Sequence, residues 1–151
     1  MTCINLTHGQ DFSNRAAIHK LLGGNLQSGI TMATKAKAIL LFKNAEELYS
    51  DYFYPNGSKD YCLYTGIGRT GDQDSVENHS YNLNIAVMSH RQQGKALLLF
   101  EKRERTYYFI SEYRLTGTHQ NMQPDDSNTM RRVFVFHLEK ISDSVEVAIT
   151  E

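Results

Sequence analysis

The residues best suited to chemistry in this sequence gather in two short stretches rich in tyrosine, which hold Tyr49, Tyr52, Tyr54, Asn56, Tyr64 and Thr65. Two flat rings separated by the thickness of a base, with an Asp, Asn or Thr at the rim, can stack an extrahelical nucleobase and bond its Watson–Crick edge. Tyrosines at alternate positions also pack on ordinary sheets, because strands favour them. Base recognition and plain packing are therefore both open at this point.

Two other kinds of chemistry have weaker signals. Gly66, Gly68 and Gly71 follow a predicted strand, as in a phosphate-binding loop, but no Gly-Lys-Ser/Thr comes after them. The carboxylate pair Asp72 and Asp74 suggests a two-metal nuclease site, whereas a position in a charged loop explains the pair equally simply. Glu101 with Glu104 has the same two explanations.

Thiol and metal sites have little support from spacing. Cys3 and Cys62 lie far apart, and neither belongs to a Cys-x-x-Cys pair. The histidines show no spacing that aligns metal ligands on a helix: they are His8, His19, His79, His90, His119 and His137. No metal and no cofactor are expected.

The formal net charge of -1 argues weakly against a nucleic-acid binder, because cationic contacts to phosphates supply most non-specific affinity. The charge is nevertheless uneven: residues 11–43 hold five basic side chains against one acid, and residues 139–151 hold four acids against one lysine. A basic face with an acidic far side fits these counts, as does scattered surface charge.

The length of 151 residues and the hydrophobic content of 40% fit one ordinary domain. No run approaches the roughly 18 apolar residues of a membrane span, and the first 25 residues lack the apolar stretch of a signal peptide. We expect a soluble, cytoplasmic protein with no membrane contact.

Periodicity predicts a mixture of helices and strands. A helix capped by Ser13 or Asn14 ends at Gly23-Gly24, and a second helix, capped by Asn82, runs towards Gly94. A brief helical turn is expected at 44–49 and polar loops at 66–80 and 117–130. Strands are predicted at 36–42, 61–65, 96–101, 106–115, 132–139 and 145–149. These elements indicate an α+β fold, in which a strongly bent sheet or partly closed barrel carries helices at its edge.

An ordered series of motifs extends over nearly the whole chain. It runs through Gly9-Gln10-Asp11-Phe12-Ser13-Asn14-Arg15, Leu22-Gly23-Gly24, Ile39-Leu40-Leu41-Phe42, Tyr64-Thr65-Gly66-Ile67-Gly68-Arg69, Asn84-Ile85-Ala86-Val87 and Arg131-Arg132-Val133-Phe134-Val135-Phe136-His137-Leu138. In this series the chain resembles the SRA (SET- and RING-associated) domains that read methylated cytosine, above all the ScoMcrA-like branch of modification-dependent restriction endonucleases.

The resemblance implies one domain over residues 1–151, with a core at about 9–141 and a last strand or tail at 142–151. Its fold would be an SRA/PUA-like, strongly bent β-barrel with two or three helices at the edge. A base would rotate into a pocket beside the Tyr-Thr-Gly strand, where Tyr64 is the stacking ring and Thr65 bonds the rim. The opposite ring would be Tyr52, with Tyr49 or Tyr54 as substitutes, and the pocket acid has two candidates, Asp51 and Asn56.

The resemblance, together with the basic side chains of the early face and around Arg69 and Arg91, gives the set of expected DNA-binding residues: Gln27, Lys35, Lys37, Arg69, Asp72, Gln73, Asn84, His90 and Arg91. Asn84 and His90 suit the capping and packing of a helix equally well. The segment 66–80 lacks the Asn-Lys-Arg finger of eukaryotic members, so a preference for hemimethylated sites is not carried over.

The expected function is binding of double-stranded DNA that carries 5-methylcytosine or 5-hydroxymethylcytosine, by base flipping, as the recognition module of a restriction or defence system. The module itself is expected to be non-catalytic, with an HNH-type nuclease domain or subunit as its partner. Two alternatives stay open: a small metal-dependent nuclease that uses Asp72 and Asp74, and a scaffold or regulatory module that has lost base recognition.

Overall fold

The computed structural model describes residues 2–45 and 51–150, in which two helices accompany ten strands. The elements in chain order are β1 (Thr2–Thr7), β2 (Asp11–Phe12), α1 (Arg15–Leu22), β3 (Ile30–Met32), β4 (Ala38–Asn44), β5 (Tyr52–Tyr54), β6 (Tyr61–Thr65), α2 (Tyr81–Met88), β7 (Ala96–Arg103), β8 (Thr106–Pro124), β9 (Met130–Ser142) and β10 (Ser144–Ile149). The α+β class expected from the sequence is confirmed, and closure into a barrel stays a prediction.

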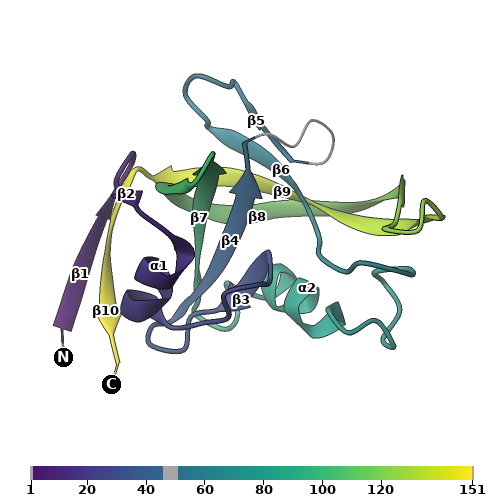
Figure 1. Ribbon diagram of the computed structural model, residues 1–151, viewed down its shortest axis with the longest axis horizontal. Helices are drawn as coiled ribbons and strands as arrows, with labels where there is room; N and C mark the ends of the chain where they lie inside the picture. Colours follow the sequence, from purple (N-terminus) through teal and green to yellow (C-terminus); the bar gives the residue numbers. More distant parts are fainter. Residues whose placement is uncertain (1, 46–50, 151) are drawn as a thin grey trace.

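One large sheet carries most of the chain, in the order β3-β4-β7-β8-β9-β6-β5 (Figure 1). Neighbouring strands in it are antiparallel except β4 and β7, which run parallel. β1 and β10 form a separate antiparallel pair, so the strand alternative is right for residues 144–149. Both chain ends lie beside this pair, next to α1, and the β8–β9 hairpin extends to the opposite end of the molecule (Figure 1).

Apolar residues pack on both sides of the sheet and form two hydrophobic cores. One core gathers Ile39, Leu41, Tyr64, Leu99 and Phe136, with side chains of α2 packed against it. The other gathers alternate residues of the same central strands with side chains of α1, β1 and β10, among them Leu22, Leu40, Leu98, Phe100 and Val147. β4 and β7 are therefore buried on both faces, which explains their nearly unbroken apolar runs.

The expected start and end of α1 are confirmed. The Asn14 side chain accepts a 2.9 Å hydrogen bond from the backbone N–H of Ala17, which satisfies one of the free donors at the helix start. Gly23 ends the helix with a φ of 78°, a conformation that glycine adopts without a steric cost.

Two sequence expectations about elements are wrong. The expected loop at 117–130 is mostly strand, because β8 continues to Pro124 and β9 already begins at Met130. This part of the hairpin is largely exposed, so its residues lack the apolar alternation that marks a half-buried strand. Asn82 does not cap α2, which begins at Tyr81 after Ser80 and ends at Met88. None of the helices in the described ranges is long and apolar enough to cross a membrane.

Candidate nucleic-acid interface

The carboxylate of Asp51 lies directly beside the Tyr64-Thr65 end of β6. Its Oδ1 accepts a 2.6 Å hydrogen bond from the backbone N–H of Thr65. Asp51 immediately precedes β5, and β5 pairs with β6, so this bond continues the ladder between the two strands. Two of the residues expected around a base pocket are thus joined by a direct hydrogen bond.

Tyr64 lies on the inner side of β6 and is only 1% exposed. Its hydroxyl is 2.9 Å from the backbone carbonyl oxygen of Gly29 and 2.7 Å from that of Phe42, so it can donate to either. The tyrosine therefore ties β6 to β4 and to the segment that leads into β3. In this conformation its ring is packed in the core, so a base can stack on it only after neighbouring chain has moved away.

Tyr52 and Tyr54 project from the opposite face of the β5–β6 hairpin. Phe53 pairs with Cys62 and both are buried, whereas Tyr52 and Tyr54 alternate with Phe53 and are 52% and 38% exposed. Tyr54 stacks on the neighbouring Tyr61 with ring centroids 5.2 Å apart. The expected sandwich of Tyr52 or Tyr54 against Tyr64 is therefore not present in this arrangement, because side chains alternate between the two faces of a strand.

The two remaining pocket candidates differ in their positions. Asn56 lies in the exposed turn after β5, where its backbone carbonyl accepts a hydrogen bond from Lys59 Nζ at 2.7 Å. Of these two candidates for the polar group of the pocket, it is Asp51 whose side chain contacts the Tyr64-Thr65 strand. Tyr49 lies outside the described residues.

The chain before β3 approaches the hydroxyl of Tyr64 and is held in place by Arg15. Nη2 of this arginine donates to the backbone carbonyls of Asn25 and Ser28 at 2.7 and 2.9 Å. Its guanidinium carbon lies 3.7 Å from the ring centroid of Phe42. Gln27 is exposed on this pinned loop, which places it on the side of the domain where Gly29 meets Tyr64.

Gln73 and Asn84, both expected to bind DNA, are instead buried supports of the segment after β6. Gln73 Nε2 donates to Gly66 O at 2.7 Å while its Oε1 accepts from Phe134 N at 2.9 Å. Asn84 bonds both backbone groups of Ile67, at 2.8 and 2.9 Å. These side chains are 1% and 0% exposed, so DNA cannot reach them in this arrangement. Buried amides of this kind satisfy backbone groups that a loop leaves unpaired.

Asp72 and Asp74 are both bound by Arg132 of β9. Its Nη2 lies 2.8 Å from Asp72 Oδ2, and its Nε lies 3.1 Å from Asp74 Oδ2. The hydrogen bond from Arg132 lowers the pKa of the Asp74 carboxyl. Across residues 2–45 and 51–150, no cluster of three or more His, Cys, Asp or Glu side chains is placed to hold a metal ion. The two aspartates thus serve to fasten the 66–80 segment to the hairpin.

Arg69 and Lys35 remain on the surface, at separate places. The side chain of Arg69 is 90% exposed, and its Nε lies 2.8 Å from Asp126 near the tip of the β8–β9 hairpin. A hollow of about 540 Å³ lies beside it, bounded by the 77–80 segment. Lys35 lies near the chain ends, where its Nζ donates to Lys20 O and its backbone carbonyl accepts from Thr150 N.

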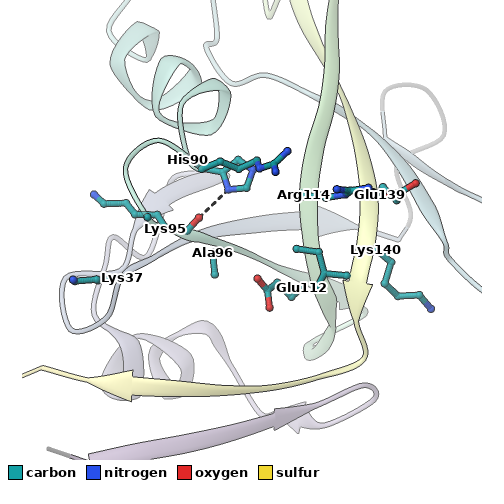
Figure 2. Close-up of a pocket in the computed structure, with 11 residues that line it drawn as sticks. Lys37, His90, Lys95, Ala96, Glu112, Arg114, Glu139 and Lys140 are labelled. Atoms are coloured by element: carbon teal, nitrogen blue, oxygen red, sulfur yellow. Dashed lines mark hydrogen bonds and ion pairs between the residues drawn. The ribbon is translucent and has the colours of Figure 1, made fainter.

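A second set of the expected DNA-binding residues lines an open groove of about 660 Å³ (Figure 2). Lys37, His90 and Lys95 lie on one side of it, with Arg114, Glu139 and Lys140 of the β8–β9 hairpin across from them. Arg91 also lines the groove. The carboxylate of Glu112 points into the opening between the two sides (Figure 2), and partial burial raises its pKa. The groove thus carries more basic than acidic side chains.

His90 supports the wall of this groove and is only 3% exposed. Its Nε2 accepts a 3.2 Å hydrogen bond from the Leu115 N–H, so its Nδ1 carries the proton and donates to the Lys95 carbonyl at 2.8 Å. Burial lowers the pKa of this imidazole, in keeping with its neutral state. Contact between His90 and DNA is therefore not supported by this arrangement.

A buried ion pair that spacing in the sequence did not suggest lies in the first core. Lys43 Nζ is 3.2 Å from Glu101 Oε2, and the two side chains are 6% and 7% exposed. They face each other because β4 and β7 pair in parallel with Lys43 opposite Glu101. Arg103 Nε lies 2.8 Å from the other oxygen of Glu101. Only the pairing of distant strands reveals this contact.

The fold of this chain is similar to that of several solved structures. The chain matches ScoMcrA, a Type IV phosphorothioation-dependent restriction endonuclease, at a TM-score of 0.70 and 23% identity, over 89% of this chain and 28% of that one. It also matches the SUVH5 SRA domain in a complex with methylated CHH DNA, at a TM-score of 0.63 and 18% identity, over 90% and 89% of the two chains. The modification-dependent TagI restriction endonuclease matches at 0.60 and 21%, over 90% and 50%.

This chain therefore spans well under half the length of the ScoMcrA endonuclease. A comparison with curated protein sequences returned no match. The family described as "ScoMcrA-like, SRA domain" matches residues 8–149, which is nearly the whole sequence. The chain accordingly belongs to the ScoMcrA-like SRA domain family.

Proposed function

We propose that this chain is a non-catalytic reader of modified DNA, which receives a base flipped out of the duplex beside Asp51, Tyr64 and Thr65. The observation that carries the proposal is the Asp51 carboxylate, which is fixed at 2.6 Å from the backbone N–H of Thr65. A carboxylate accepts a hydrogen bond from the exocyclic amino group of cytosine, and a tyrosine ring next to it offers a stacking surface.

The base would enter between β6 and the pinned loop that carries Gln27. Tyr64 is the ring it would meet, and the rearrangement that exposes this ring would break the hydrogen bonds from its hydroxyl to Gly29 and Phe42. Flipping itself costs a few kcal/mol of unstacking. The contacts to the base must offset both costs, which favours selection of a modified base that adds apolar contact area, such as 5-methylcytosine or 5-hydroxymethylcytosine.

Basic side chains on the surface would hold the phosphates. The basic candidates are Arg69, Lys35, Lys37 and Arg91, and the exposed amide of Gln27, on the loop next to Tyr64, is a polar candidate. Contacts of this kind position the duplex and make affinity depend on salt, while the base site supplies selectivity. Asp72 and Asp74, the carboxylates considered for a nuclease site, are instead paired with Arg132. Cleavage of the bound DNA would therefore come from an HNH-type nuclease domain or subunit.

The test measures equilibrium binding at one salt concentration to a single duplex that carries cytosine, 5-methylcytosine, 5-hydroxymethylcytosine or a phosphorothioate at one position. We expect a base-modified duplex to bind best, with enhanced fluorescence of a 2-aminopurine placed next to the target as the sign of flipping. Asp51→Ala should remove the preference. Asn56→Ala, in the exposed turn of the same hairpin, is the matched control and should keep it.

Three outcomes would contradict the proposal. Equal binding of all four duplexes favours a scaffold that has lost base recognition. Preference for the phosphorothioate alone means that the backbone, and not a flipped base, is read. Cleavage of DNA by the purified chain that needs Mg²⁺ and stops with a chelator favours the nuclease alternative.

A further inference from the structure

We propose that His119 and His137 form a two-ligand site for a late first-row divalent metal ion, such as Zn²⁺, on the β8–β9 hairpin. His119 Nδ1 and His137 Nε2 lie 2.5 Å apart, and the ring centroids are separated by 4.8 Å at an interplanar angle of 66°. Both side chains lie on neighbouring strands, so the backbone brings two metal-binding nitrogens to one point.

The hairpin has a local irregularity that sets up this contact. His137 pairs with Gly117, and His119 pairs with Val135, so the two histidines are diagonal neighbours on adjacent strands. The register shifts between Leu115 and Gly117, where β8 has one extra residue. Gly117, directly opposite His137, has no side chain to separate the rings, and the space above it is open. The hydroxyl of Thr116 fixes the bulge by donating to the His137 carbonyl at 3.2 Å.

The geometry suits a metal ion after a small rotation of the side chains. Zn–N distances of 2.0–2.1 Å in a tetrahedral site require the two nitrogens to be about 3.3 Å apart. The rings therefore need to open by less than about 1 Å. The His119–His137 contact is on the exposed surface of the hairpin, where His119 is exposed and His137 is partly buried.

The proton balance of binding is simple. A neutral imidazole carries one N–H, so at this separation one of the two facing nitrogens donates to the other. Metal binding requires both facing nitrogens to be unprotonated. The donor ring meets this by moving its proton to its other nitrogen, which is a change of tautomer.

Two imidazole ligands favour some divalent metal ions over others. Imidazole suits Zn²⁺, Cu²⁺ and Ni²⁺, whereas Mg²⁺ and Ca²⁺ prefer oxygen ligands. The nearest acid on the same face of β9, Glu139, is held by Arg114 Nε at 2.9 Å. Water or a small anion would fill the remaining coordination positions, and the metal would link β8 to β9 at the bulge.

The experiment titrates the full chain with Zn²⁺ by calorimetry and follows the imidazole nitrogens by ¹⁵N NMR. We expect one ion per chain and shifts confined to His119 and His137. His119→Gln and His137→Gln should each weaken binding by at least about tenfold, because even the loss of a side chain that only orients a metal ligand usually costs about tenfold or more. Unchanged melting temperatures of the metal-free variants would show that they fold.

Matched controls make the test specific. His79→Gln replaces an exposed histidine in the 66–80 segment and Cys3→Ser an exposed thiol, and neither should alter the affinity for Zn²⁺. Mg²⁺ should leave the histidine signals unmoved. The proposal is overturned if Zn²⁺ does not bind, if binding survives in His119→Gln, or if it is lost in either control. All these outcomes are independent of DNA binding.

Discussion

The carboxylate of Asp51 accepts a 2.6 Å hydrogen bond from the backbone N–H of Thr65, and this bond joins the start of β5 to the end of β6. An aspartate at this position has two roles. It accepts a hydrogen bond from a backbone donor at the end of the β5–β6 pairing, and it places a negative charge next to Tyr64. Substitutions at position 51 can separate these two roles.

Asp51→Asn should keep the fold and change the choice of base. The amide oxygen of asparagine can still accept from Thr65, but its NH₂ group donates and cannot accept from the amino group of cytosine. We expect the melting temperature to stay close to that of the parent chain while discrimination between modified cytosine and other bases falls about tenfold or more, since one good base contact is worth about 1–3 kcal/mol. Binding competition with modified duplexes measures this, and an unaltered preference would remove Asp51 from the base site.

Gly66→Ala should destabilise the segment after β6. A Cβ at Gly66 would lie 2.7 Å from Gln73 Oε1 and 2.8 Å from Asn84 Oδ1, which accept hydrogen bonds from Phe134 and Ile67. Displacing these buried amides leaves backbone donors unpaired, at about 1–3 kcal/mol for each. We expect the free energy of unfolding in urea to fall by about 2–4 kcal/mol.

Gly117→Ala is the matched control for that substitution. A Cβ at Gly117 meets no atom within 4 Å, so this variant should unfold close to the parent chain. Similar losses at both positions would mean that the amides of Gln73 and Asn84 do not set the cost at Gly66.

Lys43→Met should destabilise the fold strongly, although the apolar methionine would by itself suit a buried position. The substitution leaves the Glu101 carboxylate buried, with the partly exposed Arg103 as its remaining charged partner among the described residues. Removing one member of a buried pair costs about 3–5 kcal/mol, and the remaining Arg103 places the expected loss near the lower value. The double variant Lys43→Met, Glu101→Leu should be less destabilised than the sum of the single changes, as denaturant unfolding of all four proteins can show. Strict additivity would indicate that the two side chains do not interact.

Stability should fall as the pH drops below neutrality, because two histidines are folded in their neutral form. Burial lowers the pKa of both His19 and His90. Each Nε2 accepts a hydrogen bond, from Arg15 Nε and Leu115 N respectively, and neither bond survives protonation of that nitrogen. The unfolded chain, with ordinary histidine pKa values near 6.5, then binds more protons than the folded chain.

The free energy of unfolding therefore decreases as pH falls from about 7.5 to 5.5, by at most about 1.4 kcal/mol per pH unit for each histidine. Glu112, whose pKa is raised by burial, acts in the opposite direction at the acidic end. Urea titrations across this range measure the slope. The double variant His19→Gln, His90→Gln should have a flatter profile, and an equally steep one would place the proton uptake elsewhere.

Patterns within short windows of the sequence determined the elements that depend on local chemistry. A cap at Ser13 or Asn14 and the glycine end of α1 follow from the hydrogen-bonding needs of a helix terminus, and the buried strands β4 and β7 follow from their apolar runs. The ordered motifs from Gly9 to Leu138 were sufficient to indicate the SRA family. Short or exposed strands such as β1, β3 and β5 were missed, because too few residues carry their pattern.

Tertiary structure alone decided what each candidate side chain does, because its contacts come from residues far away in the chain. The faces of β5 and β6 separate Tyr52 from Tyr64, and the pairing of β6 with β9 makes Gln73 a buried bridge. Asp51 and Asn56 were equal candidates by sequence, and only the fold brings one of them to Thr65. Local propensity fixes where strands form, whereas register and face decide which polar groups meet, and these depend on long-range pairing that no short window of sequence contains.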